Sequence, residues 1–119
     1  MNRIAIFPGS FSPFTLGHKS VVDSAIPLFD KVIIAVGINS EKNQYFSIEE
    51  RMQWIESVYD NNQKIEIKRY EGLTVDFCKK ENANYIIRGL RDSHDFKFEK
   101  NIAQMNKKLN PDIETIFII

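Results

Sequence analysis

The feature that most constrains the fold is a nearly continuous apolar run, KVIIAVGI, at residues 31–38. A strand with one wet face alternates polar and apolar residues, whereas a continuous β-branched run is typical of a strand covered on both faces of a parallel sheet. Residues 65–70 alternate and predict a strand with one wetter face. Three further apolar runs are expected to be strands: 4–7, 85–87 and 113–119.

Helical patterns separate these expected strands. Apolar residues recur at helical spacing in four segments: 18–29, 47–59, 73–80 and 92–109. Ser47 followed by Glu50 is the signature of a capping box and predicts that a helix begins there. Pro27 is expected to distort the last turn of the first helix. The alternation predicts an α/β protein with a Rossmann-like, five-stranded parallel sheet and helices on both faces.

Ligands of such sheets bind beyond the carboxyl ends of the strands, so the loops that follow strands hold the candidate site residues. In the first loop, Gly9 lets the backbone approach a ligand, and Ser10 offers a hydroxyl and an N–H. His18 follows near a helix start, where free N–H groups and the helix dipole favour an anion. The alternative for His18 is simple packing at the start of that helix.

The fourth loop contains two arginines. Arg88 stands at the end of a buried strand, where a guanidinium is unfavourable unless an anion meets it. Arg88 and Arg91 flank Gly89, and arginine suits bidentate phosphate recognition. The alternative is a pair of surface or ion-paired arginines that meet Asp92 or Glu99.

Other candidates carry less information. Lys42 lies in a loop at the same expected sheet edge, although most loop lysines are simply solvated. His94 has no partner pattern, and Cys78 is expected to be a buried small apolar residue rather than a nucleophile. No Ser–His–Asp order, zinc spacing or carboxylate pair stands out, which weighs against a hydrolase or a protein-bound metal.

Charge and cysteine content exclude several classes of protein. Sixteen Lys and Arg balance sixteen Asp and Glu, so a general electrostatic affinity for nucleic acid or an acidic membrane is not expected. The longest apolar runs, at 32–38 and 116–119, are much shorter than a membrane span. A single cysteine excludes an intrachain disulfide, and no secretory signal is evident. We therefore expect a cytoplasmic protein.

Two blocks of sequence resemble a known family. Residues 7–18, FPGSFSPFTLGH, resemble the opening of the bacterial phosphopantetheine adenylyltransferase family, within the nucleotidyltransferase superfamily marked by (H/T)xGH. The second block comprises IRGLR at 87–91, DFKFE at 95–99 and AQMN at 103–106. TxGH alone occurs in several adenylyl- and cytidylyltransferases, whereas the second block is specific to a much smaller group of enzymes. The resemblance extends over essentially the whole chain.

The resemblance implies an enzyme of coenzyme A biosynthesis. Such an enzyme transfers the adenylyl group of ATP to 4′-phosphopantetheine, giving dephospho-coenzyme A and pyrophosphate, with Mg²⁺ bound through the ATP phosphates. No covalent enzyme intermediate is implied. The family also forms homohexamers, so ATP, 4′-phosphopantetheine and further copies of the chain are the expected partners.

The resemblance also assigns roles to residues of this chain. His18 would stabilise the transition state at the α-phosphate. The expected ATP-binding residues are Ser10, Phe11, His18, Gly89, Leu90, Arg91 and Glu99. The expected residues for the second substrate are Ser10, Lys42, Thr74 and Arg88. Ser10 stands where the family often has Thr and keeps the hydroxyl, whereas Phe98 replaces a frequent Tyr and loses one.

One departure from the family leaves alternatives open. Family chains continue past the strand at 114–119 with a Ser-rich loop that binds ATP phosphates at a helix start. We therefore expect residues 1–119 to form a single nucleotidyltransferase domain that lacks this C-terminal loop and its helices. The alternatives are a non-catalytic, truncated fragment that binds nucleotide or pantetheine, or another nucleotidyltransferase of the superfamily, using nicotinamide mononucleotide or glycerol phosphate.

Overall fold

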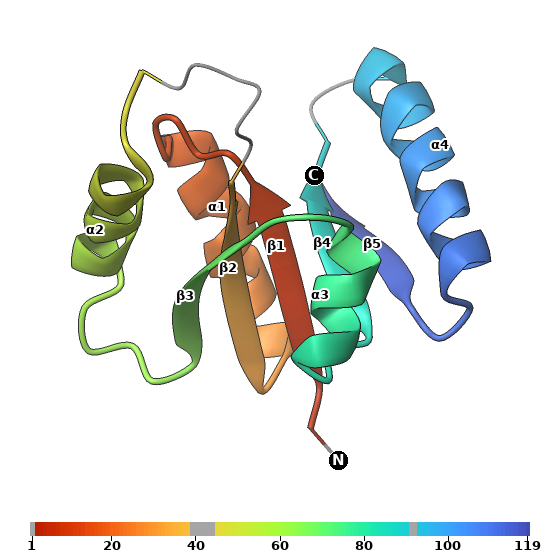
Figure 1. Ribbon diagram of the computed structural model, residues 1–119, viewed down its shortest axis with the longest axis horizontal. Helices are drawn as coiled ribbons and strands as arrows, with labels where there is room; N and C mark the ends of the chain where they lie inside the picture. The colour runs from red at the N-terminus through yellow and green to blue at the C-terminus, as the bar shows by residue number, and fades with distance from the viewer. Residues whose placement is uncertain (1, 39–44, 91–92) are drawn as a thin grey trace.

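The computed structural model describes residues 2–38, 45–90 and 93–119, and it contains a five-stranded parallel sheet (Figure 1). The order across the sheet is β3-β2-β1-β4-β5. The strands are β1 (Ile4–Gly9), β2 (Lys31–Gly37), β3 (Ile65–Tyr70), β4 (Tyr85–Gly89) and β5 (Glu114–Ile118). The predicted fold class is confirmed.

The strand order reverses between β1 and β4, which is the switch point of the sheet. β1 pairs with β2 along the whole length of β1, from Ile4 to Gly9. β4 pairs with β1 only at Ala5 and Ile6. Each strand is two residues longer than the apolar run that predicted it. Beyond Ile6 and Ile86, β1 and β4 share no ladder. This separation opens the sheet edge where ligands bind in such folds.

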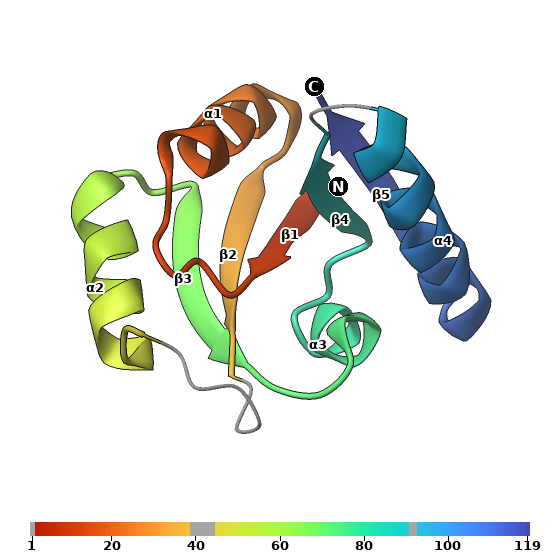
Figure 2. The same ribbon diagram turned by 90° about the horizontal axis from the view of Figure 1, so that it is seen from above.

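Helices cover both faces of the sheet, as Figure 2 shows. α1 (Leu16–Ala25) and α2 (Ile48–Val58) lie on one face, and α3 (Thr74–Lys80) lies on the other. α1 continues into a 3₁₀ turn (Ile26–Leu28) with Pro27 in its first positions, which confirms the predicted distortion. The capping box of α2 also forms, with the Glu50 N–H donating to Ser47 Oγ at 3.1 Å.

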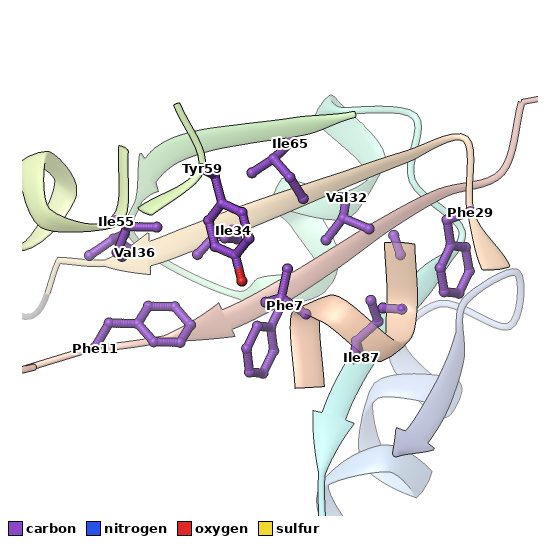
Figure 3. Packing of buried hydrophobic residues seen from close by; sticks show 13 residues of the cluster. Phe7, Phe11, Phe29, Val32, Ile34, Val36, Ile55, Tyr59, Ile65 and Ile87 are labelled. Carbon is purple, nitrogen blue, oxygen red and sulfur yellow. The ribbon is translucent and has the colours of Figure 1, made fainter. Parts of the chain in front are cut away.

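The core explains the apolar run that dominates the sequence. Side chains of β2 alternate between two buried clusters, so Val32, Ile34 and Val36 join the cluster under α1 and α2 (Figure 3). Ile33 and Ala35 join the cluster under α3. All five are fully buried. A strand with two dry faces has no position left for a polar side chain, which is why the run is continuous.

α4 (Ser93–Leu109) lies beside the edge strand β5 (Figure 1). Its apolar stripe is exposed rather than buried against the sheet, with exposed fractions from 38% at Ile102 to 65% at Phe98. Met105 and Leu109 continue the stripe and are also exposed. Among the described residues, no helix has the length and apolar character needed to cross a membrane.

Candidate active site

A cleft of about 730 Å³ lies at the switch point, between the loop after β1, the start of α1 and the end of β4. Seven predicted site residues line it: Ser10, Phe11, His18, Arg88, Gly89, Leu90 and Glu99. A smaller cavity of about 170 Å³ adjoins it, shares Arg88 and Glu99, and contains Thr74 in its wall. Lys42 and Arg91 lie outside the described residues. The structure thus brings the described candidates to one edge of the sheet.

The loop after β1 is held in an unusual conformation. Phe11 has a positive φ of 49° and is 3% exposed, although bulky residues rarely adopt the left-handed region. Its ring folds back over Gly9, where an added Cβ would lie 2.9 Å from the Phe11 ring. Glycine is therefore required at position 9 for the ring to pack there. Phe11, packed in this way, is part of the lining of the cleft.

His18 belongs to the capping box that starts α1. Its backbone N–H donates to Thr15 Oγ1 at 3.3 Å, and its Nδ1 accepts the Thr15 N–H at 2.9 Å. Because Nδ1 is an acceptor, the neutral imidazole carries its proton on Nε2. The alternative, that His18 packs at the start of the helix, is therefore partly correct. The capping contacts fix the imidazole ring, and Nε2 remains available as a donor.

Three aromatic rings surround the imidazole. The ring centroids of Phe11, Phe14 and Phe7 lie 5.0, 5.5 and 6.2 Å from that of His18. Burial, with the positive charge of Arg88 as a smaller cause, lowers the pKa of His18 below 6.5. At neutral pH, His18 is therefore a neutral residue with one N–H to donate.

Arg88 is fixed by an ion pair and a backbone carbonyl. Its Nε and Nη2 donate to the two carboxylate oxygens of Glu99 at 2.7 and 3.0 Å. Its Nη1 donates to the carbonyl of Pro8 at 2.9 Å, across the gap where β1 and β4 no longer pair. A guanidinium has five N–H donors, so two remain for an anion in the cleft.

Glu99 is the ion-pair partner of Arg88. It is 8% exposed, and both of its oxygens face Arg88. Ion pairing of the arginines with Glu99, one of the alternatives, is confirmed for Arg88. Contact between Glu99 and a nucleotide stays a prediction.

Sequence analysis missed Arg51. Its guanidinium, on α2, is 4% exposed and donates to backbone carbonyls of the loop after β1 and the end of β2. One signal was available, because position 51 falls between Ile48 and Ile55 on the helix face expected to be buried. An arginine on such a face needs internal partners.

The described residues offer neither a protein-built metal site nor an activated thiol. No three His, Cys, Asp or Glu side chains gather within the described ranges. Cys78 is fully buried, and burial raises its pKa to about 12. The thiol is therefore protonated at neutral pH, which confirms that Cys78 packs as an apolar residue. What the cleft does offer is a set of positioned N–H donors suited to phosphate.

Sequence comparison identifies relatives that match nearly the whole chain. The cytidylyltransferase-like family model matches residues 6–119. The phosphopantetheine adenylyltransferase of Cytophaga hutchinsonii is 50% identical over 119 residues, covering 100% of this chain and 79% of that protein. The phosphopantetheine adenylyltransferase of Leptospira biflexa is 52% identical over 119 residues, with 100% and 74% covered.

Solved structures share the fold. A bifunctional NMN adenylyltransferase/ADP ribose pyrophosphatase from Francisella tularensis aligns with a TM-score of 0.73 at 24% identity, over 99% of this chain and 38% of that one. A lipopolysaccharide core biosynthesis protein from Thermoplasma volcanium aligns with a TM-score of 0.71 at 16% identity, over 100% and 98%. At these identities the likeness shows the fold alone. The sequence matches show more: this chain belongs to the cytidylyltransferase-like nucleotidyltransferases and, within them, to the phosphopantetheine adenylyltransferase family.

Proposed function

We propose that this protein transfers the adenylyl group of ATP to 4′-phosphopantetheine, giving dephospho-coenzyme A and pyrophosphate. Family membership at about 50% identity supports the reaction. The structural observation that carries the proposal is the switch-point cleft, where His18 and Arg88 present N–H donors to the same space. Two phosphate-bearing substrates need such donors on both sides of the reacting phosphorus.

The reaction is a direct displacement. An oxygen of the 4′-phosphate attacks the α-phosphorus of ATP, the bond from that phosphorus to the bridging oxygen breaks, and pyrophosphate leaves. The neutral His18 donates its Nε2–H to an α-phosphate oxygen that gains charge in the transition state. This role needs no proton exchange with the enzyme, which fits a histidine whose pKa is lowered by burial and then by Arg88. Catalysis then depends on orientation and charge stabilisation rather than on an enzyme nucleophile.

The adjoining cavity suits the pantetheine arm. Its wall combines the aliphatic Ile102 with the polar Thr74 and Asn106, and Arg88 stands where this cavity meets the larger cleft. Thr74 Oγ1 lies 3.1 Å from the hydroxyl of Tyr70, so the two hydroxyls are held together. An apolar chain with amides fits such a wall, with its phosphate at Arg88 and Lys42. Ser10, Phe11, Gly89, Leu90 and Arg91 would then contact ATP.

Three further properties belong to this proposal. Mg²⁺ would be held by the ATP phosphates, because the described residues gather no ligand set of their own, and it would neutralise phosphate charge. The protein would assemble as a homohexamer, as the family resemblance implies, and the exposed apolar stripe of α4 supports association between chains. It would act in the cytoplasm.

A substrate panel tests the proposed reaction. The protein is incubated with ATP, Mg²⁺ and one acceptor: 4′-phosphopantetheine, nicotinamide mononucleotide or glycerol phosphate. We expect pyrophosphate release and a dephospho-coenzyme A mass only with the first acceptor. Release with either of the other acceptors would identify a different nucleotidyltransferase, and binding of both substrates without release would indicate a non-catalytic protein.

A further inference from the structure

Arg51 is a buried cation that has no counterion among the residues the structure describes. Among the described residues only Arg51 and Glu99 are both charged and buried, and Glu99 is paired with Arg88. No carboxylate within residues 2–38, 45–90 and 93–119 forms an ion pair with Arg51. Arginine is almost never fully buried unless it is paired, and the start of α2 is the positive end of the helix dipole. A buried guanidinium at this position is therefore expected to have a specific role.

The contacts of Arg51 join three elements at the site edge of the sheet. Nη1 donates to the carbonyl of Ser10 at 2.7 Å and approaches the carbonyl of Gly37 at 3.4 Å. Nε donates to the carbonyl of Ser47 at 3.3 Å. The guanidinium therefore ties the loop after β1 to the end of β2 and to the start of α2. The Ser10 contact is the shortest and spans 41 positions of the chain.

The Ser10 carbonyl fixes the orientation of the next N–H group. The Ser10–Phe11 peptide is trans, so its N–H points away from the side on which Arg51 holds its carbonyl. No acceptor among the described residues pairs with the Phe11 N–H. Ser10 and Phe11 both line the cleft, so the peptide group between them lies at its wall.

The same peptide sets the strained backbone of Phe11. A positive φ of 49° at a bulky residue persists only when surrounding contacts impose it. The Phe11 ring in turn packs edge-on against the imidazole of His18, with centroids 5.0 Å apart. A continuous chain of contacts thus runs from Arg51 through Ser10 and Phe11 to His18.

We infer that Arg51 is a positioning residue that holds the Ser10–Phe11 peptide in the orientation that binds the ATP phosphates. This inference rests on the proposed function for its ligand, whereas the loop geometry it explains is independent of activity. Arg51 acts through the backbone carbonyl of Ser10 and does not itself touch substrate. Its fork-shaped group matters as well as its charge, because one guanidinium reaches three carbonyls.

The test compares Arg51→Met, Arg51→Lys and the control Arg69→Met. Arg69 is an exposed arginine whose contact with Glu49 is long, at 3.8 Å, so the control removes a guanidinium from outside the site. The first readout is the intraresidue Hα–HN NOE of Phe11, which reports a positive φ. The second is the split between kcat and KM for ATP and for 4′-phosphopantetheine in pyrophosphate release.

We expect Arg51→Met to remove the NOE signature and to lower kcat/KM for ATP about ten-fold or more, as loss of a charge-assisted hydrogen bond implies. The KM for 4′-phosphopantetheine should change less, because Lys42, Thr74 and Arg88 are expected to bind this substrate together with Ser10. Arg51→Lys keeps the charge but loses the fork, so its ATP defect should be intermediate, and Arg69→Met should match the parent protein.

Several results would overturn the inference. An unchanged Phe11 NOE in Arg51→Met would do so whatever the activity, and so would equal defects for both substrates. Failure of both Arg51 variants to fold would assign the residue to core stability alone. A parent protein that releases no pyrophosphate would refute the proposed function instead, and the NOE would still decide the role of Arg51.

Discussion

At the scale of single residues, each donor in the cleft is held in place by its own hydrogen bonds. Arg88 binds Glu99 through two nitrogens and Pro8 through the third, which leaves its direction fixed before any ligand arrives. His18 is fixed in the same way by the backbone N–H of Thr15. Preorganised donors of this kind need little rearrangement in the transition state.

Glu99→Gln should weaken the binding of 4′-phosphopantetheine while leaving the fold intact. Gln keeps one acceptor but replaces the other with an amide N–H that faces a guanidinium nitrogen, so Arg88 loses its bidentate partner. We expect the KM for 4′-phosphopantetheine to rise about ten-fold, in keeping with loss of one charge-assisted bond. Steady-state kinetics measure this, with Glu114→Gln as an exposed control. A Glu99→Gln protein with unchanged KM would show that Arg88 needs no partner.

The pKa of His18 is a second test at this scale. Burial is the larger cause of the lowered pKa and Arg88 the smaller, so Arg88→Gln should raise the pKa only part of the way to 6.5. Nitrogen-15 NMR titration follows the ring and also reports whether Nε2 carries the proton. Full recovery to 6.5 would reverse the order of the two causes, and an Nδ1–H tautomer would contradict the capping geometry.

The same lowered pKa fixes the sign of a stability effect. Below pH 6.5, the unfolded chain binds a proton at His18 before the folded protein does. The contribution of His18 to the free energy of unfolding is therefore constant above that pH and falls as the pH drops through it. At pH 6.5 more than half of the folded protein should therefore keep His18 neutral, and a pH profile of kcat should show activity falling as the pH drops below 6.5.

At the scale of elements, the start of α2 links stability to the site. Ser47 caps this helix with its side chain, and its carbonyl accepts from Arg51. Ser47→Ala removes only the side-chain cap, which should lower the free energy of unfolding by about 1 kcal/mol. Chemical denaturation measures the change, with Ser57→Ala on the same helix as the control. Equal stability of the two variants would mean that the capping box contributes nothing.

The elements show what sequence could and could not predict. The strand β2 was predictable because burial on both faces allows only apolar residues between 32 and 36. The extension of β4 through Arg88 was not predictable. A polar residue after an apolar run is typical of a loop, and the hydrogen bond of Arg88 to the Pro8 carbonyl cannot be seen in the sequence. Arg51 was missed for a related reason. Its partners are backbone carbonyls, and carbonyls leave no mark in the sequence.

The candidate site was largely predictable because its residues follow the strands of one sheet edge. Ser10, His18 and Arg88 needed only the strand order to be placed near one another. Glu99 was one of two candidate partners of Arg88 in the sequence. The structure was needed to identify it, because the two residues belong to different elements, α4 and β4, that are joined by a loop. Lys42 and Arg91, outside the described residues, remain predictions.

At the scale of the whole molecule, we expect the exposed apolar stripe of α4 to pack against another protein chain. Phe98, Met105 and Leu109 expose more than half of their surfaces on one helix. Contiguous apolar patches of this kind commonly mark protein interfaces. We expect sedimentation equilibrium to give the mass of six chains, and the mass of one chain at micromolar concentration would contradict the homohexamer.

We expect His18 to act in adenylyl transfer at the switch-point cleft. The kcat of pyrophosphate release by His18→Ala tests this role. The reaction contains ATP, 4′-phosphopantetheine and Mg²⁺, and Lys19→Ala, an exposed neighbour paired with Asp23, is the matched control. Removing one preorganised donor should lower kcat about 10²–10³-fold. The control should retain the parent rate. A His18→Ala rate within a few-fold of the parent would contradict the claim and leave His18 as a helix cap alone.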